Sequence, residues 1–420
     1  MDKFVIEGGH RLQGRLRIAG AKNGSLALMP AALLAGGIYH LYNTPNLNDI
    51  WTMSKLLSSM GVVCDFDGKE LKIDSRSITS YEAPYEHVKK MRASFYVLGP
   101  LVARFGYAKV SLPGGCAWGP RPVDLHLKGL EKLGAEIEVE GGYVIAKAKK
   151  LKGAAFNFDI SSVGATGNVM MAAVLAKGTT VLTNAAIEPE MTALAEMLVK
   201  MGAKINGVGT PTLEIEGVEE LQPVNEETIP DRIEAATYLI AAAMTEGDVT
   251  LENTNPHHLT SVLSKLVDAG CHIDTDDSSI HISMDGNPKP VDITTSIYPG
   301  IPTDIQAQWT AFMLKANGSS KITDSIYHDR FKHVPELQRL GADIEVVDNV
   351  SLVNGGKNLT GAIVMSSDLR ASASLILAAL VADGITEVLR IYHIDRGYEE
   401  IEEKLSSLGA VIRRVKSELI

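Results

Sequence analysis

A short glycine motif returns six times along the 420-residue chain at nearly constant spacing. In each copy a glycine ends an amphipathic stretch and is followed by an apolar run. The six positions are Gly61, Gly134, Gly202, Gly270, Gly341 and Gly409, separated by 73, 68, 68, 71 and 68 residues. A fixed period indicates one structural unit repeated along the chain, so the fold must accommodate six copies of it.

Each copy predicts the same order of elements, which residues 164–205 illustrate. A nearly apolar run ends at Gly178, a β-rich run (TTVLTNA) follows, and an amphipathic run ends at Gly202 before the next strand. Glycine is expected just past a helix because it adopts a left-handed conformation without strain. The unit is therefore roughly strand-helix-strand-helix-strand-strand. Its first helix is apolar on every side, which predicts burial, and its second helix is amphipathic.

Six such units predict an α/β protein of two domains with three units each. Buried helices surrounded by sheets would invert the usual layering of α/β proteins. Residues 1–20 precede the first helix, and we expect them to complete a unit of the C-terminal half. With a boundary near Thr228–Pro230, one domain would comprise residues 21–229 and the other residues 1–20 plus 230–420.

Composition excludes several classes of protein. The chain has 40 Lys and Arg against 51 Asp and Glu, a net charge of -11, which argues against a general nucleic-acid-binding protein. Three cysteines without paired spacing, together with an N-terminus unlike a signal peptide, predict a reduced, cytoplasmic protein without membrane insertion. We also expect no metal, no cofactor and no obligatory protein partner.

Cations stand where helix physics disfavours them. Four of the six first helices are predicted to begin at or beside a cation, namely Lys22, Arg92, Arg232 and Arg370. A cation at a helix N-terminus opposes the helix dipole by about 0.3–1 kcal/mol unless an acid or anion lies nearby. Equivalent ends of repeats lie on one face of a domain. We therefore predict an anion-binding surface built from helix N-termini.

Further arginines near the second helices, Arg121, Arg330 and Arg396, extend this predicted surface. The alternative is that some of these cations form interdomain salt bridges. It stays open above all for Arg232 and Arg330, and the candidate acidic partners are Asp231, Asp329, Asp368 and Asp395.

The segment SLPGGCAWGPRPVDLH (111–126) departs from the repeat by inserting a Gly- and Pro-rich loop around Cys116. A reactive thiol needs exposure and nearby positive charge, and Arg121 is five residues away. We interpret the loop as a lid that closes over a substrate. The alternative is a flexible loop with an incidental cysteine. Cys64 and Cys271 follow repeat glycines and fit small core residues.

Seven motifs taken together resemble the UDP-N-acetylglucosamine 1-carboxyvinyltransferase family of enolpyruvyl transferases, over essentially the whole chain. They are AGAKNG, PGGCAWGPRPVDLHLKGLEKLGA, SVGATGN, IPDRIEA, PTDIQAQ, DLRASASLILA and IYHIDRGYE. The resemblance implies the inside-out α/β barrel fold, with two domains of three repeats each, buried helices and an active site in the interdomain cleft. It implies phosphoenolpyruvate and UDP-N-acetylglucosamine as substrates. Both are strongly anionic, which accounts for a cationic surface in an acidic protein.

The reaction that the resemblance implies opens peptidoglycan synthesis. The sugar 3-hydroxyl attacks C2 of phosphoenolpyruvate while C3 takes a proton, and the tetrahedral intermediate then loses phosphate. Lys22, Arg121 and Arg396 would hold the phosphate and carboxylate of phosphoenolpyruvate. Cys116 matches the general acid or covalent nucleophile that fosfomycin alkylates. Asp304 would accept the hydroxyl proton, with a helix N-cap as its structural alternative.

The resemblance also implies the remaining substrate contacts. Asn23 would lie near the reacting centre, residues 121–125 would grip the uridine, and residues 162–164 would donate to the diphosphate at a helix N-terminus. His126 is either a structural histidine or a ligand contact. The full set of expected binding residues is Lys22, Asn23, Arg92, Arg121, Pro122, Val123, Asp124, Leu125, Ser162, Val163, Gly164, Thr303, Asp304, Ile326, Asp368 and Arg370.

Departures from the family pattern weaken the diphosphate assignment most. Many relatives carry Glu where this chain has Gly167, and some carry a basic residue near Asp159 and Ile160; Trp118 is bulkier than expected. A sister enolpyruvyl transferase acting on shikimate 3-phosphate is the nearest rival. The PGGC loop and the RPVDL segment favour the sugar nucleotide. A non-catalytic ring-like clamp would need neither the Cys116 loop nor the cations at helix starts.

Overall fold

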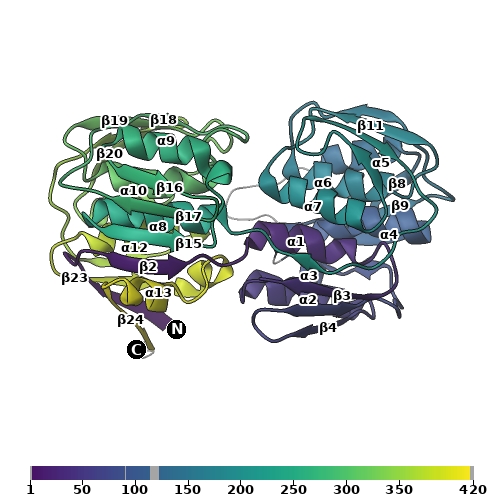
Figure 1. Ribbon diagram of the computed structural model, residues 1–420, viewed down its shortest axis with the longest axis horizontal. Helices are drawn as coiled ribbons and strands as arrows, with labels where there is room; N and C mark the ends of the chain where they lie inside the picture. Colours follow the sequence, from purple (N-terminus) through teal and green to yellow (C-terminus); the bar gives the residue numbers. More distant parts are fainter. Residues whose placement is uncertain (1, 90, 114–122, 417–420) are drawn as a thin grey trace. The chain divides into compact units, whose positions relative to one another are not determined.

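A computed structural model describes residues 2–89, 91–113 and 123–416. The chain divides into two compact units (Figure 1). Unit 1 comprises residues 1–19 and 230–420, and unit 2 comprises residues 20–229. The chain therefore starts in unit 1, forms the whole of unit 2, and returns to unit 1.

Unit 2 contains three four-stranded sheets among its described residues. In each sheet a short edge strand pairs in parallel with the next strand, and the remaining pairs are antiparallel. The strand orders are β14 (Glu226–Glu227), β3 (Ile38–Tyr42), β5 (Leu71–Asp74), β4 (Val63–Phe66); β6 (Glu82–Ala83), β7 (Tyr107–Ser111), β9 (Tyr143–Lys147), β8 (Glu136–Glu140); and β10 (Ala155–Asn157), β11 (Thr179–Thr183), β13 (Thr212–Glu216), β12 (Lys204–Asn206).

Unit 1 repeats this plan in its described part and draws two strands from the N-terminus. Strand β1 lies inside its sheet, where Phe4 faces Val388 on one side and Arg414 on the other. The orders are β2 (Gln13–Arg17), β15 (Asp248–Glu252), β17 (Ser279–Ser283), β16 (His272–Thr275); β18 (Ile293–Thr294), β19 (Ser319–Thr323), β21 (Val350–Asn354), β20 (Asp343–Val347); and β22 (Ile363–Met365), β23 (Ile385–Leu389), β1 (Asp2–Glu7), β24 (Val411–Lys416).

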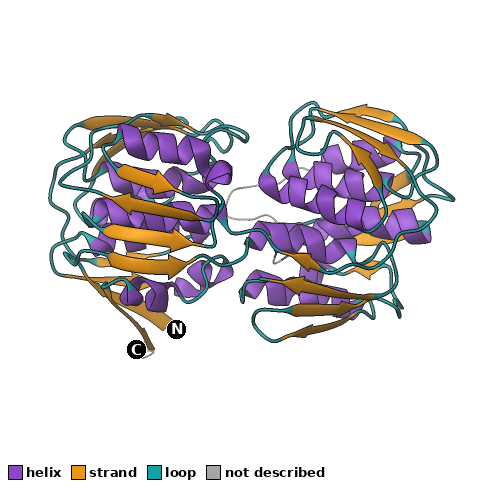
Figure 2. Ribbon diagram, viewed as in Figure 1, coloured by secondary structure: helices purple, strands orange, loops and turns teal. Residues whose placement is uncertain are grey.

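The first helix of each repeat lies in the interior of its unit, with strands outside it (Figure 2). Every residue of α12 is buried, and in α8 so is every residue from Ile233 on. This confirms the burial predicted from their apolar surfaces. These helices are α1 (Lys22–Ala31), α4 (Leu98–Phe105, after the 3-10 helix η1, Arg92–Val97), α6 (Val163–Ala173), α8 (Arg232–Met244), α10 (Gln306–Met313, after η3, Thr303–Ile305) and α12 (Leu369–Leu380).

The second helices are partly exposed, and a repeat glycine follows each of them. The φ angles of the six repeat glycines lie between 92° and 107°, which confirms the predicted left-handed helix ends. The second helices are α2 (Asn48–Ser59), α5 (Asp124–Lys132), α7 (Pro189–Lys200), α9 (Thr260–Asp268), α11 (Val334–Arg339) and α13 (Ile401–Ser407). Shorter helical segments are α3 (Tyr85–Val88), η2 (Pro256–Leu259) and η4 (Ile391–Arg396).

Two of the three cysteines are structural. Cys271 is buried and Cys64 is partly buried. Burial raises the pKa of the Cys64 thiol to about 11 and that of Cys271 to about 12, so both stay protonated at neutral pH. Within the described ranges, no group of three or more His, Cys, Asp or Glu side chains is arranged to hold a metal ion. No described helix combines the length and the apolar character that a membrane span needs.

Two buried helices of unit 2 approach closely at Gly99 in α4. A Cβ atom at this position would lie 2.2 Å from the backbone oxygen of Asn168 in α6. The Gly99 N–H also donates a hydrogen bond to the Asn168 side-chain oxygen. Because the obstructing atom belongs to the backbone, relief requires the two helices to separate.

We predict that Gly99→Ala destabilises the protein by about 1–3 kcal/mol through overpacking. The matched control is Gly134→Asn, where no described atom lies within 4 Å of the added Cβ and asparagine tolerates the left-handed conformation. It should cost less than about 1 kcal/mol. Urea unfolding of both variants tests this, and equal losses would contradict the steric argument.

Candidate active site

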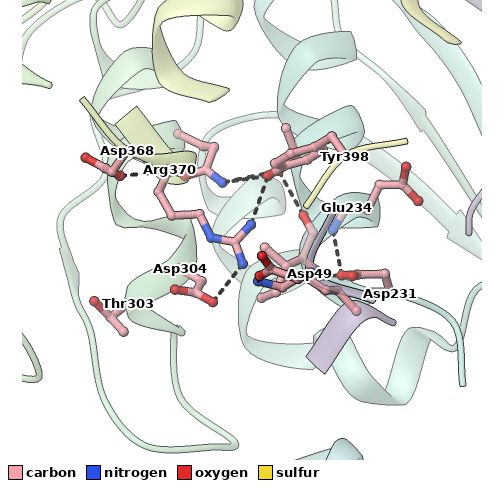
Figure 3. A network of polar contacts seen from close by, with 12 residues as sticks. Asp49, Asp231, Glu234, Thr303, Asp304, Asp368, Arg370 and Tyr398 are labelled. Atoms are coloured by element: carbon pink, nitrogen blue, oxygen red, sulfur yellow. Dashed lines mark hydrogen bonds and ion pairs between the residues drawn. The ribbon is translucent and has the colours of Figure 1, made fainter. Parts of the chain in front are cut away.

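In unit 1, the Asp304 carboxylate lies between two arginines. Its Oδ1 atom is 2.8 Å from Arg330 Nη2. Its Oδ2 atom accepts a 2.8 Å hydrogen bond from Arg370 Nη2, which Figure 3 shows. The arginine side chains are 11% and 7% exposed, whereas that of Asp304 is 26% exposed. Two nearly buried guanidinium groups therefore fix the direction of a partly accessible carboxylate.

The helix N-cap alternative for Asp304 is wrong. Asp304 lies inside η3, whereas Pro302 and Ile305 occupy the N-cap positions of η3 and α10. The two arginines were predicted as part of an anion-binding surface, and the structure pairs both with this one acid. Among the acidic partners considered for them, Asp395 pairs with Arg414 instead, at 2.6 Å.

A network of buried polar side chains contacts Arg370 through a second nitrogen of its guanidinium group. Its Nη1 atom donates to the Tyr398 hydroxyl at 3.3 Å, and that hydroxyl is 2.7 Å from Thr237 Oγ1 and 3.2 Å from Gln308 Nε2. Burial by itself lowers the pKa of Arg370, but the Asp304 carboxylate and Tyr398 outweigh it and hold the pKa above its usual range. None of Tyr398, Thr237 and Gln308 was predicted as a site residue, although Gln308 and Tyr398 lie within the PTDIQAQ and IYHIDRGYE motifs. Thr237 and Gln308 lie in buried helices and Tyr398 lies between η4 and α13, so only the folded chain brings them to Arg370.

Asp368 is the N-cap of α12. Its Oδ1 accepts from the N–H groups of Arg370 and Ala371, both at 3.0 Å. The carboxylate offsets the unfavourable charge of Arg370 in the first turn. Thr303 Oγ1 accepts a 3.0 Å hydrogen bond from Arg330 Nη1. The structure therefore brings Thr303, Asp304, Asp368 and Arg370, four of the predicted residues, close to one another.

In unit 2, Lys22 is the first residue of α1 and pairs with the buried Asp49 of α2. The Nζ–Oδ2 distance is 3.2 Å, and the side chains are 12% and 6% exposed. Asp49 supplies the nearby acid that a lysine at a helix N-terminus needs. Arg232 in unit 1, another such cation, stacks over the ring of Tyr298 with its guanidinium 5.5 Å from the centroid.

The N-terminus of α6 carries three of the residues expected to bind the diphosphate. Ser162 is its N-cap and accepts from the Ala165 N–H at 3.3 Å. His126 lies against this end, because a Cβ on Gly164 would be 3.1 Å from its Nε2. Asn168 donates to His126 Nδ1 at 3.0 Å, so the ring carries its proton on Nε2. Nε2 has no hydrogen-bond partner among the described residues.

The other predicted residues of unit 2 that the structure describes are spread over three elements, α5, η1 and α1. Val123 is buried, Asp124 begins α5, and Leu125 packs against the core. Arg92 begins η1 and Asn23 follows Lys22 in α1. In unit 1, Arg396 ends η4 and Ile326 follows β19, 38% exposed. Cys116, Trp118, Arg121 and Pro122 lie outside the described residues.

Packing explains one departure from the family pattern. Gly167 is buried in α6, and a Cβ there would lie 2.8 Å from Tyr96 Cε1 and 3.1 Å from Met191 Sδ. The present packing has no room for a glutamate side chain. Ile160, at the position where some relatives have a basic residue, is 71% exposed.

Comparison with known proteins decides the family. The family model for EPSP synthase (3-phosphoshikimate 1-carboxyvinyltransferase) matches residues 6–405. The UDP-N-acetylglucosamine 1-carboxyvinyltransferases of Chloroherpeton thalassium and Chlorobium chlorochromatii are 58% and 56% identical to this chain. Each match covers 99% of this chain, and 97% and 99% of the relative. The chain belongs to the UDP-N-acetylglucosamine 1-carboxyvinyltransferase family. It is therefore an enzyme of the enolpyruvyl transferase class.

Solved structures agree on the fold. The enolpyruvyl transferase NikO from Streptomyces tendae superposes with a TM-score of 0.90 at 26% identity, covering 99% of both chains. EPSP synthase from Acinetobacter baumannii superposes with a TM-score of 0.76 at 20% identity, covering 99% of this chain and 100% of that chain. The mixed α/β fold predicted from the repeats is therefore the fold of enolpyruvyl transferases.

Because His126 is buried, we expect the stability of the fold to decrease at acidic pH. Burial, with a smaller contribution from Arg92, lowers the pKa of His126 to about 3. The unfolded state then binds one more proton than the folded state between about pH 6.5 and pH 3. The free energy of unfolding should therefore fall as pH falls through this window, by up to about 1.4 kcal/mol per pH unit for this residue.

We predict that His126→Asn removes this one-proton contribution to the pH slope of stability. Phe95→Leu is the matched control, because Phe95 packs edge-on against the His126 ring at 5.2 Å and carries no titrating group. The control should lower stability at every pH with the slope intact. Urea unfolding of both variants between pH 6.5 and pH 4.5 checks this. Equal slopes in all three proteins would contradict the assignment.

Proposed function

We propose that the chain transfers the enolpyruvyl group of phosphoenolpyruvate to the 3-hydroxyl of UDP-N-acetylglucosamine and releases phosphate. The observation that carries this proposal is the 54–58% identity, over 99% of the chain, to relatives named for this reaction. EPSP synthases, which stand for the shikimate 3-phosphate alternative, are only 20% identical where structures were compared and support the fold alone. The reaction would take place in the cytoplasm and begin peptidoglycan synthesis.

Asp304 would accept the proton of the attacking hydroxyl. Its partial exposure and its fixed orientation support this role, since a general base must be held within hydrogen-bonding reach of the proton it removes. The negative charges of the substrates would attract Arg330 and Arg370, the same two arginines that hold this carboxylate in place.

Residues of unit 2, together with Arg396 of unit 1, would hold the anionic groups. Lys22, with Arg121 and Arg396, would bind the phosphate and carboxylate of phosphoenolpyruvate and stabilise the departing phosphate. Asn23 would contact the reacting centre, and Arg92 and residues 121–125 would contact the sugar nucleotide. The N-terminus of α6 would bind the diphosphate, with Ser162, Val163 and Gly164 as donors.

In unit 1, Thr303, Ile326, Asp368 and Arg370 would complete the sugar-nucleotide contacts. We further propose that the two units correspond to the two inside-out α/β barrels of the family, which share one substrate pair. The burial of the first helices in both units supports this description.

Phosphate release from phosphoenolpyruvate tests the proposal, with UDP-N-acetylglucosamine and shikimate 3-phosphate as alternative acceptors. We expect release only with the sugar nucleotide. Release only with shikimate 3-phosphate would retain the enolpyruvyl chemistry but overturn the acceptor. Release with neither acceptor would overturn the proposed function.

Cys116 provides a second test of the same proposal. We predict that Cys116→Asp keeps phosphate release, because a carboxyl group can replace the thiol as a general acid, and that it escapes inhibition by fosfomycin, which alkylates sulfur. The control is a substitution at Cys64, which packs against the core. Because an aspartate would be unfavourable there, the control variant is Cys64→Ala, and it should stay sensitive to fosfomycin. Full fosfomycin sensitivity of Cys116→Asp would contradict the role of Cys116.

A further inference from the structure

The buried Asp324 departs from a pattern that three of the six repeats share; Leu112 and Arg390, at the equivalent positions of two other repeats, depart from it as well. Asn43, Asn184 and Asn253 follow the second strands of three repeats, all with left-handed φ angles of 53–56°. Each donates its side-chain N–H to the backbone oxygen that follows the parallel edge strand, at 2.9, 2.8 and 2.7 Å. Asp324 follows β19 at the equivalent position, and a carboxylate cannot donate in this way.

The equivalent backbone oxygen in this repeat belongs to Thr295. The Thr295 N–H donates to Thr323 O at 2.9 Å, just as the residues after the other three edge strands donate to the ends of their second strands. Here the Ser325 hydroxyl donates to the Thr295 oxygen and replaces the asparagine. The Asp324 carboxylate therefore does not bind the backbone oxygen after the edge strand, as the three asparagines do.

That carboxylate turns instead toward the residues around Asp304. It is fully buried and accepts from Thr303 Oγ1 at 2.7 Å, Thr295 Oγ1 at 2.7 Å, and the N–H groups of Ile326 and Tyr327 at 3.0 and 2.9 Å. Two of these partners, Thr303 and Ile326, are expected substrate contacts. The four hydrogen bonds compensate the burial of the charge.

The direction of the hydrogen bonds links Asp324 to Asp304. Arg330 can only donate, so Thr303 Oγ1 must accept from it and give its single proton to Asp324. Arg330 donates in turn to Asp304. A second route runs through Tyr327, whose N–H is held by Asp324 and whose ring centroid lies 5.5 Å from the Arg330 guanidinium.

We propose that Asp324 is a positioning residue for enolpyruvyl transfer, which fixes the Thr303 hydroxyl as an acceptor and so holds Arg330 against Asp304. The inference rests on the proposed function. Asp324 Oδ1 accepts three of the four hydrogen bonds, so an asparagine would keep its oxygen there and place its N–H group against the Thr303 hydroxyl. In that case Thr303 would lose the acceptor that directs its proton away from Arg330.

The test compares Asp324→Asn, Thr303→Val, Thr303→Ser and the double variant Asp324→Asn/Thr303→Val in the phosphate-release assay. We expect each of the first two to lower kcat roughly 10- to 100-fold, the range for loss of a hydrogen bond to a charged group. The KM for phosphoenolpyruvate should stay within about twofold. Thr303→Ser keeps the hydroxyl and should therefore lose less kcat than Thr303→Val. The double variant should lose no more than either single variant, because both substitutions break the same connection.

Asn253→Ala is the matched control at the equivalent position of the neighbouring repeat. It removes one buried hydrogen bond and should lower the melting temperature while leaving kcat within about twofold. The inference is overturned if Asp324→Asn keeps its kcat, if the two single losses multiply in the double variant, or if Asn253→Ala loses kcat as Asp324→Asn does. Inactivity of the wild-type chain would instead overturn the proposed function.

The free energies of unfolding of the wild-type chain, the two single variants and the double variant test the Asp324–Thr303 contact independently of enzyme activity. Coupling between the two substitutions supports the contact, and strict additivity contradicts it. If Asp324→Asn does not fold, the contrast between Thr303→Val and Thr303→Ser decides whether the hydroxyl directs kcat.

Discussion

The burial of an apolar helix in every repeat is the constraint on which the structure depends. A helix that is apolar on all sides cannot be covered by its own short strands, so three repeats must combine their sheets around three such helices. Unit 1 needs β1 and β2 from the N-terminus to complete two of its sheets. The cooperation of repeats, rather than the propensity of any one element, produces each hydrophobic core.

The same arrangement accounts for the chemistry at the helix ends. Fully buried helices have polar groups at their termini, and cations in the first turn require acidic partners. Asp49 is the acidic partner of Lys22, and Asp304 and Asp368 are the acidic partners of Arg370. These pairs hold charged side chains in fixed directions before any substrate is present. Pre-organised charge of this kind is what an enzyme needs to stabilise a departing phosphate.

Much of this could be predicted from the sequence, because the deciding signals are local or periodic. The glycine period predicted the helix ends, and apolar composition predicted the buried helices. The pairing of Arg330 with Asp304 could not be predicted, since the residues are 26 positions apart and only the packing of η3 beside the loop after β19 brings them together. Tyr398, Gln308 and Asp324 were also missed. Their roles depend on the direction of hydrogen bonds, which spacing does not encode.

The placement of β1 has a consequence for how the chain acquires its structure during synthesis. Unit 2 is continuous in sequence, so it can fold once residue 229 has left the ribosome. Strand β1 cannot form its sheet until its partners β23 and β24 have been synthesised, and these lie more than 370 positions later. A strand with unpaired edges is exposed to incorrect pairing, and closing so long a loop is slow. The sheet that contains β1 therefore cannot be completed until residues 385–416 have been synthesised, and removal of β24 would leave β1 unpaired along one edge.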